Sequence, residues 1–390
     1  PEDADLVSDS KNLFLQSGVE LGAFDGRVTH RLDVRLLETE REDLTDGLET
    51  SSSKSDRTTI SYQAAIQLGV NVLSLAAERE RSTFTQRGNI IDLGMEDFLD
   101  PNQDQAMTAN SAIADFHWNI TDNLTALSSA RYDGYSDFDD SVTGRISLSY
   151  RLSDATKLRV ALGTGQKNPT FTERFGFFPG SFVGNPNLKP EKSTAYELGI
   201  EQLILEDSLE IELTYFNQNL EDEVNGFAFL PGLPDPTTIN IPGDSERKGI
   251  EFATLYDIAN NLQAGLNYTY TDSTSEPRPG NDVREVRRPA HLGSIHGNYR
   301  FTDNRANLFL IANYNGSQLD NFFPLFPQLP TTVKLPSYWL VSLTAGYDIT
   351  NTINLFVRVT NLLDEDYEEI VGFKAPGIGA YAGFSVNFGG

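Results

Sequence analysis

The stretch that decides the fold is residues 208–216, SLEIELTYF, in which apolar and polar side chains alternate one by one. A period of two places every apolar side chain on one face of an extended strand, whereas a helix would scatter them around its axis. The same alternation returns in YELGIE (196–201), NLQAGLNYTY (261–270) and TINLFVRVTN (352–361). We therefore predict an all-β protein of about seventeen strands, each with one apolar and one polar face.

The connections between these segments fall into two kinds that alternate along the chain. One kind is short and turn-like: 24–27, 68–71, 119–123, 152–157, 205–208, 258–261, 302–305 and 349–352. The other is longer and rich in Pro, Gly, Asp and Phe: 42–57, 83–105, 166–191, 224–240, 271–287 and 316–335, with shorter members at 133–141 and 364–379. Short turns on one side and long loops on the other are typical of a transmembrane antiparallel β-barrel, with periplasmic turns and extracellular loops.

A soluble β-sandwich, propeller or solenoid would also alternate apolar and polar residues. Three features favour the membrane barrel. Charged residues occupy one whole face of segments 192–204 and 207–217, as a water-filled lumen tolerates. No repeat of blade length is visible. Tyrosines recur near strand ends, as aromatic belts at membrane interfaces do: Tyr196, Tyr215, Tyr268, Tyr314, Tyr347 and Tyr381.

Composition and motifs exclude several classes of function. The 390 residues carry 56 acidic and 30 basic side chains, a formal charge of −26, which argues against a nucleic-acid partner. There is no cysteine and no apolar run long enough for a membrane-spanning helix. The histidines, His30, His117, His291 and His296, show no metal or nucleophile spacing. We expect neither an enzyme nor a cofactor or metal centre.

Four segments resemble TonB-dependent outer-membrane receptors. They are NPNLKPEKSTAYELGIE (185–201), RKGIEFATLYDIANNLQAGLNYTYTDS (247–273), RRPAHLGSIHGNYRF (287–301) and VRVTNLLDEDYEEIVGFKAPGIGAYAGFSVNF (357–388). They stand in the family's order, and Ile378 occupies a position where the family usually has arginine. The resemblance covers about residues 185–388. Before residue 130, only the alternating strand pattern supports a barrel.

The resemblance implies a barrel of 22 strands closed around an N-terminal plug, in the outer membrane of a Gram-negative bacterium. With about seventeen strands, we expect a barrel portion without plug or TonB box. Residues 1–12 would be a polar remnant of an extracellular loop, and 13–388 the receptor-like barrel. Implied partners are outer-membrane lipid, the barrel assembly machinery and, through the missing plug, the TonB–ExbB–ExbD complex. The expected function is energised uptake of a ferric siderophore or a cobalamin-like ligand; a passive porin-like channel or a surface adhesin is the rival.

A stiff corner, GNPNLKPEKS (184–193), precedes the strand at 192–204. Its prolines cannot donate hydrogen bonds to a strand ladder, and asparagine suits turn conformations, so we expect an ordered rim that sets the register of that strand. The structural family motif comprises Asn185, Pro186, Asn187, Leu188, Lys189, Pro190, Glu191 and Glu197.

Aromatic residues in the long loops are the candidates for ligand binding. Apolar rings with one guanidinium among them suit a bulky aromatic or macrocyclic ligand, but they would also suit loop-on-loop packing. The candidates are Phe171, Arg174, Phe175, Phe178, Phe182, Phe322, Phe323 and Phe326.

Two charged groups could bind a ligand or could have a purely structural role. The acidic group Asp133, Asp137, Asp139 and Asp140 suits calcium or, more simply, a solvated loop. The basic group Arg79, Arg81 and Arg87 suits an anionic ferric chelate or, more simply, a lumen or interface charge network.

Overall fold

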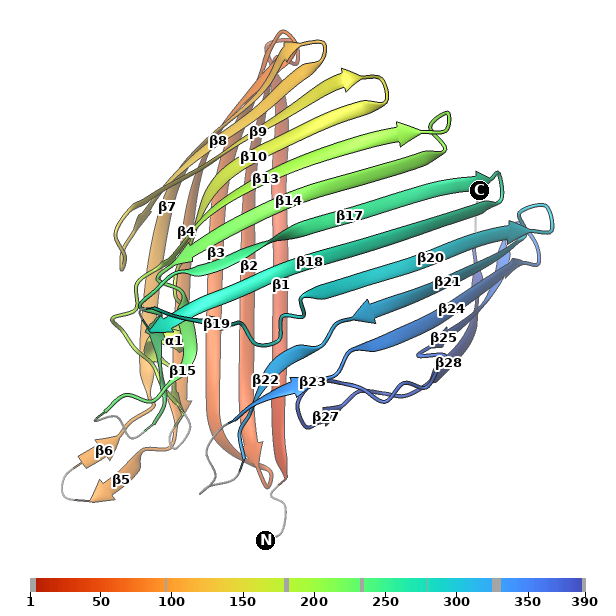
Figure 1. Ribbon diagram of the computed structural model, residues 1–390. Coiled ribbons are helices and arrows are strands. Elements are labelled where there is room, and N and C mark those ends of the chain that lie inside the picture. Colours follow the sequence, from red (N-terminus) through yellow and green to blue (C-terminus); the bar gives the residue numbers. More distant parts are fainter. Residues whose placement is uncertain are drawn as a thin grey trace. The chain divides into compact units, whose positions relative to one another are not determined.

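The computed structural model describes residues 5–94, 97–178, 182–231, 235–278, 280–324 and 331–387. Eighteen strands belong to one antiparallel sheet (Figure 1). One of them, β19 (Asn281–Arg284), is a short strand paired with the outer end of β18, which leaves seventeen long strands in the described part of the chain. The all-β fold and the strand number predicted from alternation are confirmed. Among the described residues, no helix is long or apolar enough to cross a membrane.

Consecutive long strands are antiparallel neighbours in the sheet. They are β1 (Leu6–Ala23), β2 (Val28–Thr45), β3 (Leu48–Leu68), β4 (Asn71–Gly88), β7 (Gln103–Thr121), β8 (Leu124–Tyr135), β9 (Ser141–Ser153), β10 (Thr156–Lys167), β13 (Glu191–Ile204), β14 (Leu209–Glu221), β17 (Ser245–Ala259), β18 (Leu262–Arg278), β20 (His291–Phe301), β21 (Ala306–Asn315), β24 (Tyr338–Asp348), β25 (Ile353–Thr360) and β28 (Gly379–Val386).

Short elements occupy the long connections. They are β5 (Ile91–Gly94) with β6 (Asp97–Leu99), α1 (Phe171–Phe175), β11 (Phe177–Phe178) with β12 (Phe182–Val183), β15 (Val224–Ala228) with β16 (Thr237–Asn240), β22 (Gln318–Phe322) with β23 (Thr331–Leu335), and β26 (Glu368–Ile370) with β27 (Phe373–Lys374). The long connections therefore carry secondary structure of their own.

The long loop predicted at 42–57 is wrong. Strands β2 and β3 continue through it and meet at a two-residue turn, Asp46 and Gly47, both with positive φ (52° and 76°). Such a turn matches the twist of the two strands it joins. Strand β1 likewise begins at Leu6, where Leu6 pairs with Thr45, so residues 6–12 lie in a strand rather than in the polar remnant expected up to residue 12.

By Cα proximity the chain forms two compact units. The first comprises Pro1–Leu148, Leu162–Thr194 and Leu220–Asp244, and the second comprises Ser149–Ala161, Ala195–Asn219 and Ser245–Gly390.

In the first unit, cross-strand partners sort the side chains into an apolar and a polar face. Val34 pairs with Ile60, and Leu32 pairs with Tyr62, on the apolar face. These side chains are 36–48% exposed, so no second layer covers them. A soluble sandwich would bury them at its centre. The polar face carries the residues that alternate with these apolar ones, among them Arg35 on β2 and Glu78 on β4.

The second unit shows the same apolar face with an aromatic row at each border. One row runs across β18, β20, β21 and β24 through Tyr268, Gly293, Tyr314 and Trp339. The other holds Phe301, Ala306, Tyr347, Leu355 and Phe384, at the end of the short turns. On β21 the rows are eight residues apart, or about 27 Å along the strand. At the tilt of about 40° that is usual for barrel strands, this is a height of roughly 20 Å, somewhat less than the ~25 Å of the apolar band.

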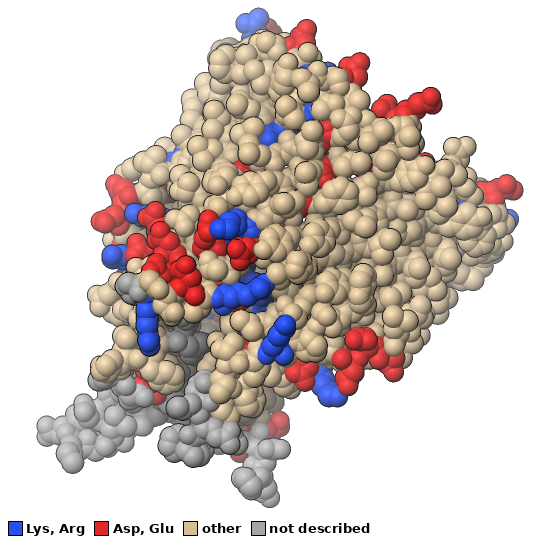
Figure 2. Space-filling model, viewed as in Figure 1, with Lys and Arg blue, Asp and Glu red and all other residues tan. Residues whose placement is uncertain are grey.

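Figure 2 shows how charge is distributed over this second unit. The surface over the middle of β17, β18, β20 and β21 carries almost no charged side chain, whereas charges gather toward the strand ends. Together with the aromatic rows, this pattern confirms the transmembrane antiparallel barrel architecture predicted from the alternation of the strands.

Candidate ligand-binding site

The connection between β10 and β13 begins with a capped single-turn helix, α1. Thr170 accepts a hydrogen bond from the Glu173 amide at 3.2 Å, and its own amide donates to the Glu173 carboxylate at 2.7 Å. This capping box satisfies two backbone donors at the start of the helix. The capping box therefore fixes the start of α1, the helical turn that carries Phe171 and Arg174.

Two glutamines hold this connection against the polar face of β4 and β7. Gln86 is 1% exposed; its Nε2 donates to the Phe177 carbonyl at 2.6 Å, and its Oε1 accepts from the Phe177 amide at 3.2 Å. Gln103 donates to the Phe175 carbonyl and to Gln86 Oε1. A buried side-chain amide that pairs with both the N–H and the C=O of one residue, as a neighbouring strand would, anchors that residue firmly.

An aromatic contact completes the anchor. The Phe171 ring stacks on Phe84 of β4 with centroids 5.8 Å apart and planes 7° apart, and Phe84 is 5% exposed. Phe84 is one of eight buried apolar residues in the described part of the chain, so this contact is a rare piece of packed core. The connection therefore forms a fixed wall over the polar face.

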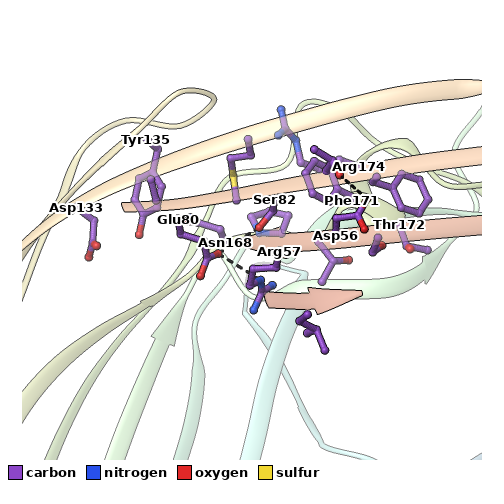
Figure 3. A pocket seen from close by; sticks show the side chains of 18 of the residues that line it. Asp56, Arg57, Glu80, Ser82, Asp133, Tyr135, Asn168, Phe171, Thr172 and Arg174 are labelled. Carbon is purple, nitrogen blue, oxygen red and sulfur yellow. Dashed lines mark hydrogen bonds and ion pairs between the residues drawn. The ribbon is translucent and has the colours of Figure 1, made fainter. Parts of the chain in front are cut away.

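Between this wall and the sheet lies a cavity of about 450 Å³ (Figure 3). Figure 3 shows side chains that enter it from β3, β4, β8 and residues 168–174. Arg57 lies 3.4 Å from Glu80 at its floor, and Asn168, Phe171 and Arg174 come from the loop side. Its size falls within the range of small-molecule sites.

Charges beneath the cavity are paired with one another. Glu78 lies 2.8 Å from Arg35 and 3.3 Å from Arg131, and Arg131 lies 2.8 Å from Asp133. Asp133 is 5% exposed and also accepts a hydrogen bond from Ser111 at 2.5 Å. The floor is thus polar, and its donors and acceptors are held in place by one another.

Arg174 is the one charged group on the loop side of the cavity. Its guanidinium lies over the Phe138 ring at 4.6 Å and the Phe175 ring at 4.5 Å, with Asp137 at 3.8 Å. Burial lowers the pKa of Arg174, and Asp137 opposes that shift. Within the described residues, its Nε has no acceptor, although the atom is buried. The Arg174 guanidinium therefore lies against two aromatic rings, with Asp137 as its acidic neighbour.

The predicted stiff corner lies directly behind this wall. Asn185 Oδ1 accepts from the Asn187 amide at 3.0 Å, and Asn185 Nδ2 donates to the Thr238 carbonyl at 3.0 Å. Leu188 is 4% exposed, and Lys189 exchanges two hydrogen bonds with Asn240 at 2.9 Å. The corner thus ties α1, β16 and the start of β13 together, with Pro186 and Pro190 outside the ladder.

The motif's two acidic residues take different positions. Glu191 opens β13; it lies 3.0 Å from Lys167 and accepts from the Val224 amide at 2.8 Å. Glu197 lies within β13 as an exposed residue on the polar face, opposite Tyr196 and Leu198. The first therefore anchors the rim, and the second belongs to the wall of the sheet.

The predicted aromatic candidates separate into two groups. Phe171, Arg174 and Phe175 come together in α1, and Phe178 faces Phe182 across the β11–β12 hairpin with ring centroids 6.4 Å apart. Phe322 and Phe323 belong to the second unit and are 41% and 62% exposed. Phe326 lies outside the described residues. Whether any of them binds a ligand stays a prediction.

The acidic group predicted as a possible calcium site is dispersed. Asp133 turns to Arg131, Asp137 to Arg174, and Asp140 accepts from the Tyr132 hydroxyl at 2.5 Å. In the described ranges, no three His, Cys, Asp or Glu side chains converge on a metal position.

Sequence reasoning missed the polar-face residues that make the floor and the anchor: Phe84, Gln86, Gln103, Arg57, Glu80 and Arg131. Alternation could have assigned them to the lumen side of their strands. Nothing in the sequence, however, links Gln86 to Phe177, which lies 91 residues further along the chain.

Comparison with known proteins places the chain in a family. Residues 7–362 match the TonB dependent receptor-like, beta-barrel family. The chain belongs to the TonB-dependent receptors.

Curated relatives of this receptor chain include two proteins named vitamin B12 transporter BtuB. The one from Photobacterium profundum is 25% identical over 92% of this chain and 54% of its own length. The one from Vibrio vulnificus is 28% identical over 63% of this chain and 36% of its own length. The chain therefore spans about half, or less, of the relatives it matches.

Solved structures share the fold. The siderophore receptor PirA from Acinetobacter baumannii has a TM-score of 0.77 at 18% identity, with 98% of this chain and 62% of that chain covered. A mutant of the ferric enterobactin receptor PfeA from Pseudomonas aeruginosa has a TM-score of 0.79 at 17% identity, with the same coverage. Identities this low show the fold alone.

Proposed function

We propose that this chain is the barrel part of an outer-membrane receptor that imports a ferric siderophore or a cobalamin-like ligand with energy from the TonB system. Membership of the TonB-dependent receptors supports the class of function. The observation that carries the proposal is the fixed wall of α1 over a polar, charge-paired floor, with a cavity of about 450 Å³ between them. A passive pore needs an open lumen face, and an adhesin needs no cavity there.

In this proposal the two sides of the cavity do different work. Phe171 and Phe175 supply apolar contact, Arg174 supplies a desolvated cation, and the floor offers hydrogen-bonding groups. A metal chelate with aromatic or anionic groups suits such a site, because rings and guanidinium select the ligand's faces and the floor orients it. Domain boundaries, membrane location and the TonB partner are parts of the same proposal.

Uptake measurements on a strain that lacks the full-length gene test the ligand class. We expect that strain to lose accumulation of one ligand class, radiolabelled ferric siderophores or radiolabelled cobalamin, and to regain it with the wild-type gene. Loss that also occurs in a strain without TonB supports energised uptake. Unchanged accumulation of every ligand tried, together with altered permeation of small solutes, favours the porin-like alternative.

A paired substitution tests the assignment of the cavity. Arg174→Gln in the full-length protein is expected to weaken ligand binding at least tenfold, since it removes the only loop-side cation among the described lining residues. Phe322→Ser/Phe323→Ser is the matched variant for the exposed aromatics of the second unit. Unchanged affinity in the first variant would remove the cavity from the binding site, and unchanged affinity in the second would remove that loop.

A further inference from the structure

Arg79 and Arg81 lie on the apolar face of β4, which rules out the lumen form of the charge network predicted for them and leaves the interface form. Ile60 pairs with Arg79, and Thr58 pairs with Arg81. Ile60 shares its face with Val34, Leu36 and Tyr62, all at least 36% exposed. Both arginines are themselves exposed. Their guanidinium groups therefore stand on the wall that faces lipid.

The flanking carboxylates point to the other face and have partners there. Glu78 binds Arg35 and Arg131, and Glu80 lies 3.4 Å from Arg57. In the part of the chain that is described, neither Arg79 nor Arg81 has an acidic partner within 4.0 Å. Arg79 donates one hydrogen bond, to Asn110 Oδ1 at 3.4 Å. The two cations thus share one face of β4 without an acidic partner, in a chain whose formal charge is −26.

Other charges on the same face are already engaged. Lys54 lies 3.0 Å from both Glu38 and Glu40, and Arg87 lies 2.8 Å from Asp104. Asp56 accepts a hydrogen bond from Thr83 at 3.3 Å. These groups are further from the short turns than the arginine pair.

The height of the pair on the wall is that of lipid headgroups. Toward the short turn, the same face of β4 continues with Ala77, Leu75 and Leu73, which pair with Ala112, Ala114 and Phe116 of β7. Outward, the face turns polar with Thr83 and Thr85. Arg79 and Arg81 thus mark the outer border of the apolar band, where basic side chains meet the phosphates of a bilayer.

We propose that Arg79 and Arg81 form a binding site for the phosphate group of an outer-leaflet lipid. The two side chains are two residues apart on one strand, about 7 Å, so their planar forks can bracket one phosphate with charge-assisted hydrogen bonds. The inference rests on the proposed location in the outer membrane, and it adds a specific lipid contact that ligand uptake does not require.

Native mass spectrometry of the full-length receptor in detergent tests this site. Wild type is compared with Arg79→Gln/Arg81→Gln, with Arg79→Lys/Arg81→Lys, and with Lys54→Gln as the matched control on the same face. Phosphatidylglycerol and phosphatidylcholine are the lipid probes, and inorganic phosphate is the free-ion probe. Heat-modifiable migration on gels establishes that each variant is folded.

We expect wild type to retain phosphatidylglycerol in preference to phosphatidylcholine. The glutamine variant should lose this retention by about 10- to 30-fold, at about fivefold for each arginine. The lysine variant should keep most of it, and Lys54→Gln should stay within twofold of wild type. Equal retention by wild type and the glutamine variant would overturn the proposal. Displacement of the lipid by millimolar inorganic phosphate would overturn its lipid specificity.

These outcomes separate the lipid site from the proposed function. If the glutamine variant loses lipid but takes up ligand normally, the lipid site stands beside an intact receptor. If wild type takes up no ligand yet retains the anionic lipid, the proposed transport fails while the lipid site stands.

Discussion

At the scale of single residues, buried amides and carboxylates hold the connections in place. Gln86 is the clearest case, because one side chain satisfies both the amide and the carbonyl of Phe177. The buried core is small, so such polar contacts carry much of the order of the long connections.

Gln86→Leu is expected to release the wall over the cavity. The change leaves the Phe177 amide and carbonyl without their partner, at a cost of about 1–3 kcal/mol. Hydrogen exchange at residues 175–178 should accelerate at least fivefold in the full-length protein, and ligand affinity should fall. Gln63→Leu, at an exposed position on β3, is the control and should leave both unchanged. Equal protection in Gln86→Leu would show that the wall is held by other contacts.

Asp320 gives the second unit an acid-sensitive contact. Burial alone would raise its pKa, but hydrogen bonds from the Val371 amide, the Arg287 guanidinium and the Asn321 amide together lower the pKa of this carboxyl. A lowered folded-state pKa means that the stabilisation is complete above the unfolded pKa of about 4 and is lost as pH falls through the folded value.

The melting temperature of Asp320→Asn, compared with wild type from pH 7 to pH 3, measures this contribution. We expect the variant to melt lower at pH 7, by the equivalent of about 1–3 kcal/mol, because Arg287 loses its charged partner. The difference should shrink as the pH falls below about 4. A constant difference across the range would contradict the assigned role of the charge.

At the scale of elements, the capped turn α1 decides how the loop meets the sheet. Thr170→Ala removes the side chain that accepts from the Glu173 amide. We expect a loss of about 1 kcal/mol in the local stability of residues 170–176 and a weaker ligand affinity. Thr172→Ala, within the same helix but outside the cap, is the control for local stability only, because the Thr172 side chain also lines the cavity. Protease sensitivity that rises equally in both variants would show that the cap is not what orders the turn.

The strands were predictable because alternation is local. Residues 209–215 repeat Leu, Ile, Leu and Tyr with period two, and any strand with one face on lipid and one on water shows this signal. The extended β2–β3 hairpin was not, although Asp46 and Gly47 are a hairpin signal. Its arms are polar on both faces and are joined by ion pairs of Lys54 on β3 with Glu38 and Glu40 on β2. A search for hydrophobic periodicity does not detect such a strand, because neither face is apolar.

The candidate site was predictable only in part. The aromatic loop stands out in composition, and the prolines of the corner indicate a fixed rim. The floor does not stand out, because the contacts of Gln86 with Phe177 and of Phe84 with Phe171 join segments nearly ninety residues apart or more. Contacts of this kind depend on register, which a one-residue slip would reverse.

At the scale of the whole molecule, the account depends on which face of the strands meets lipid. On β2 the face that carries Val28, Leu32, Val34 and Leu36, with His30 hydrogen-bonded to Tyr62 among them, spans nine residues, the length of a tilted transmembrane strand. Leu32 lies at the middle of this row. Gln63, which pairs with Arg31, lies on the polar face at the same height.

Fluorescence quenching of single tryptophans in bilayers tests this assignment most directly. All native tryptophans of the full-length protein, Trp118 and Trp339 among them, are first replaced by phenylalanine, and Leu32→Trp and Gln63→Trp are then compared. We predict that brominated lipid chains quench the tryptophan at position 32 and that aqueous iodide quenches the one at position 63. Quenching by iodide at position 32, with no effect of brominated lipid, would contradict the membrane-spanning barrel.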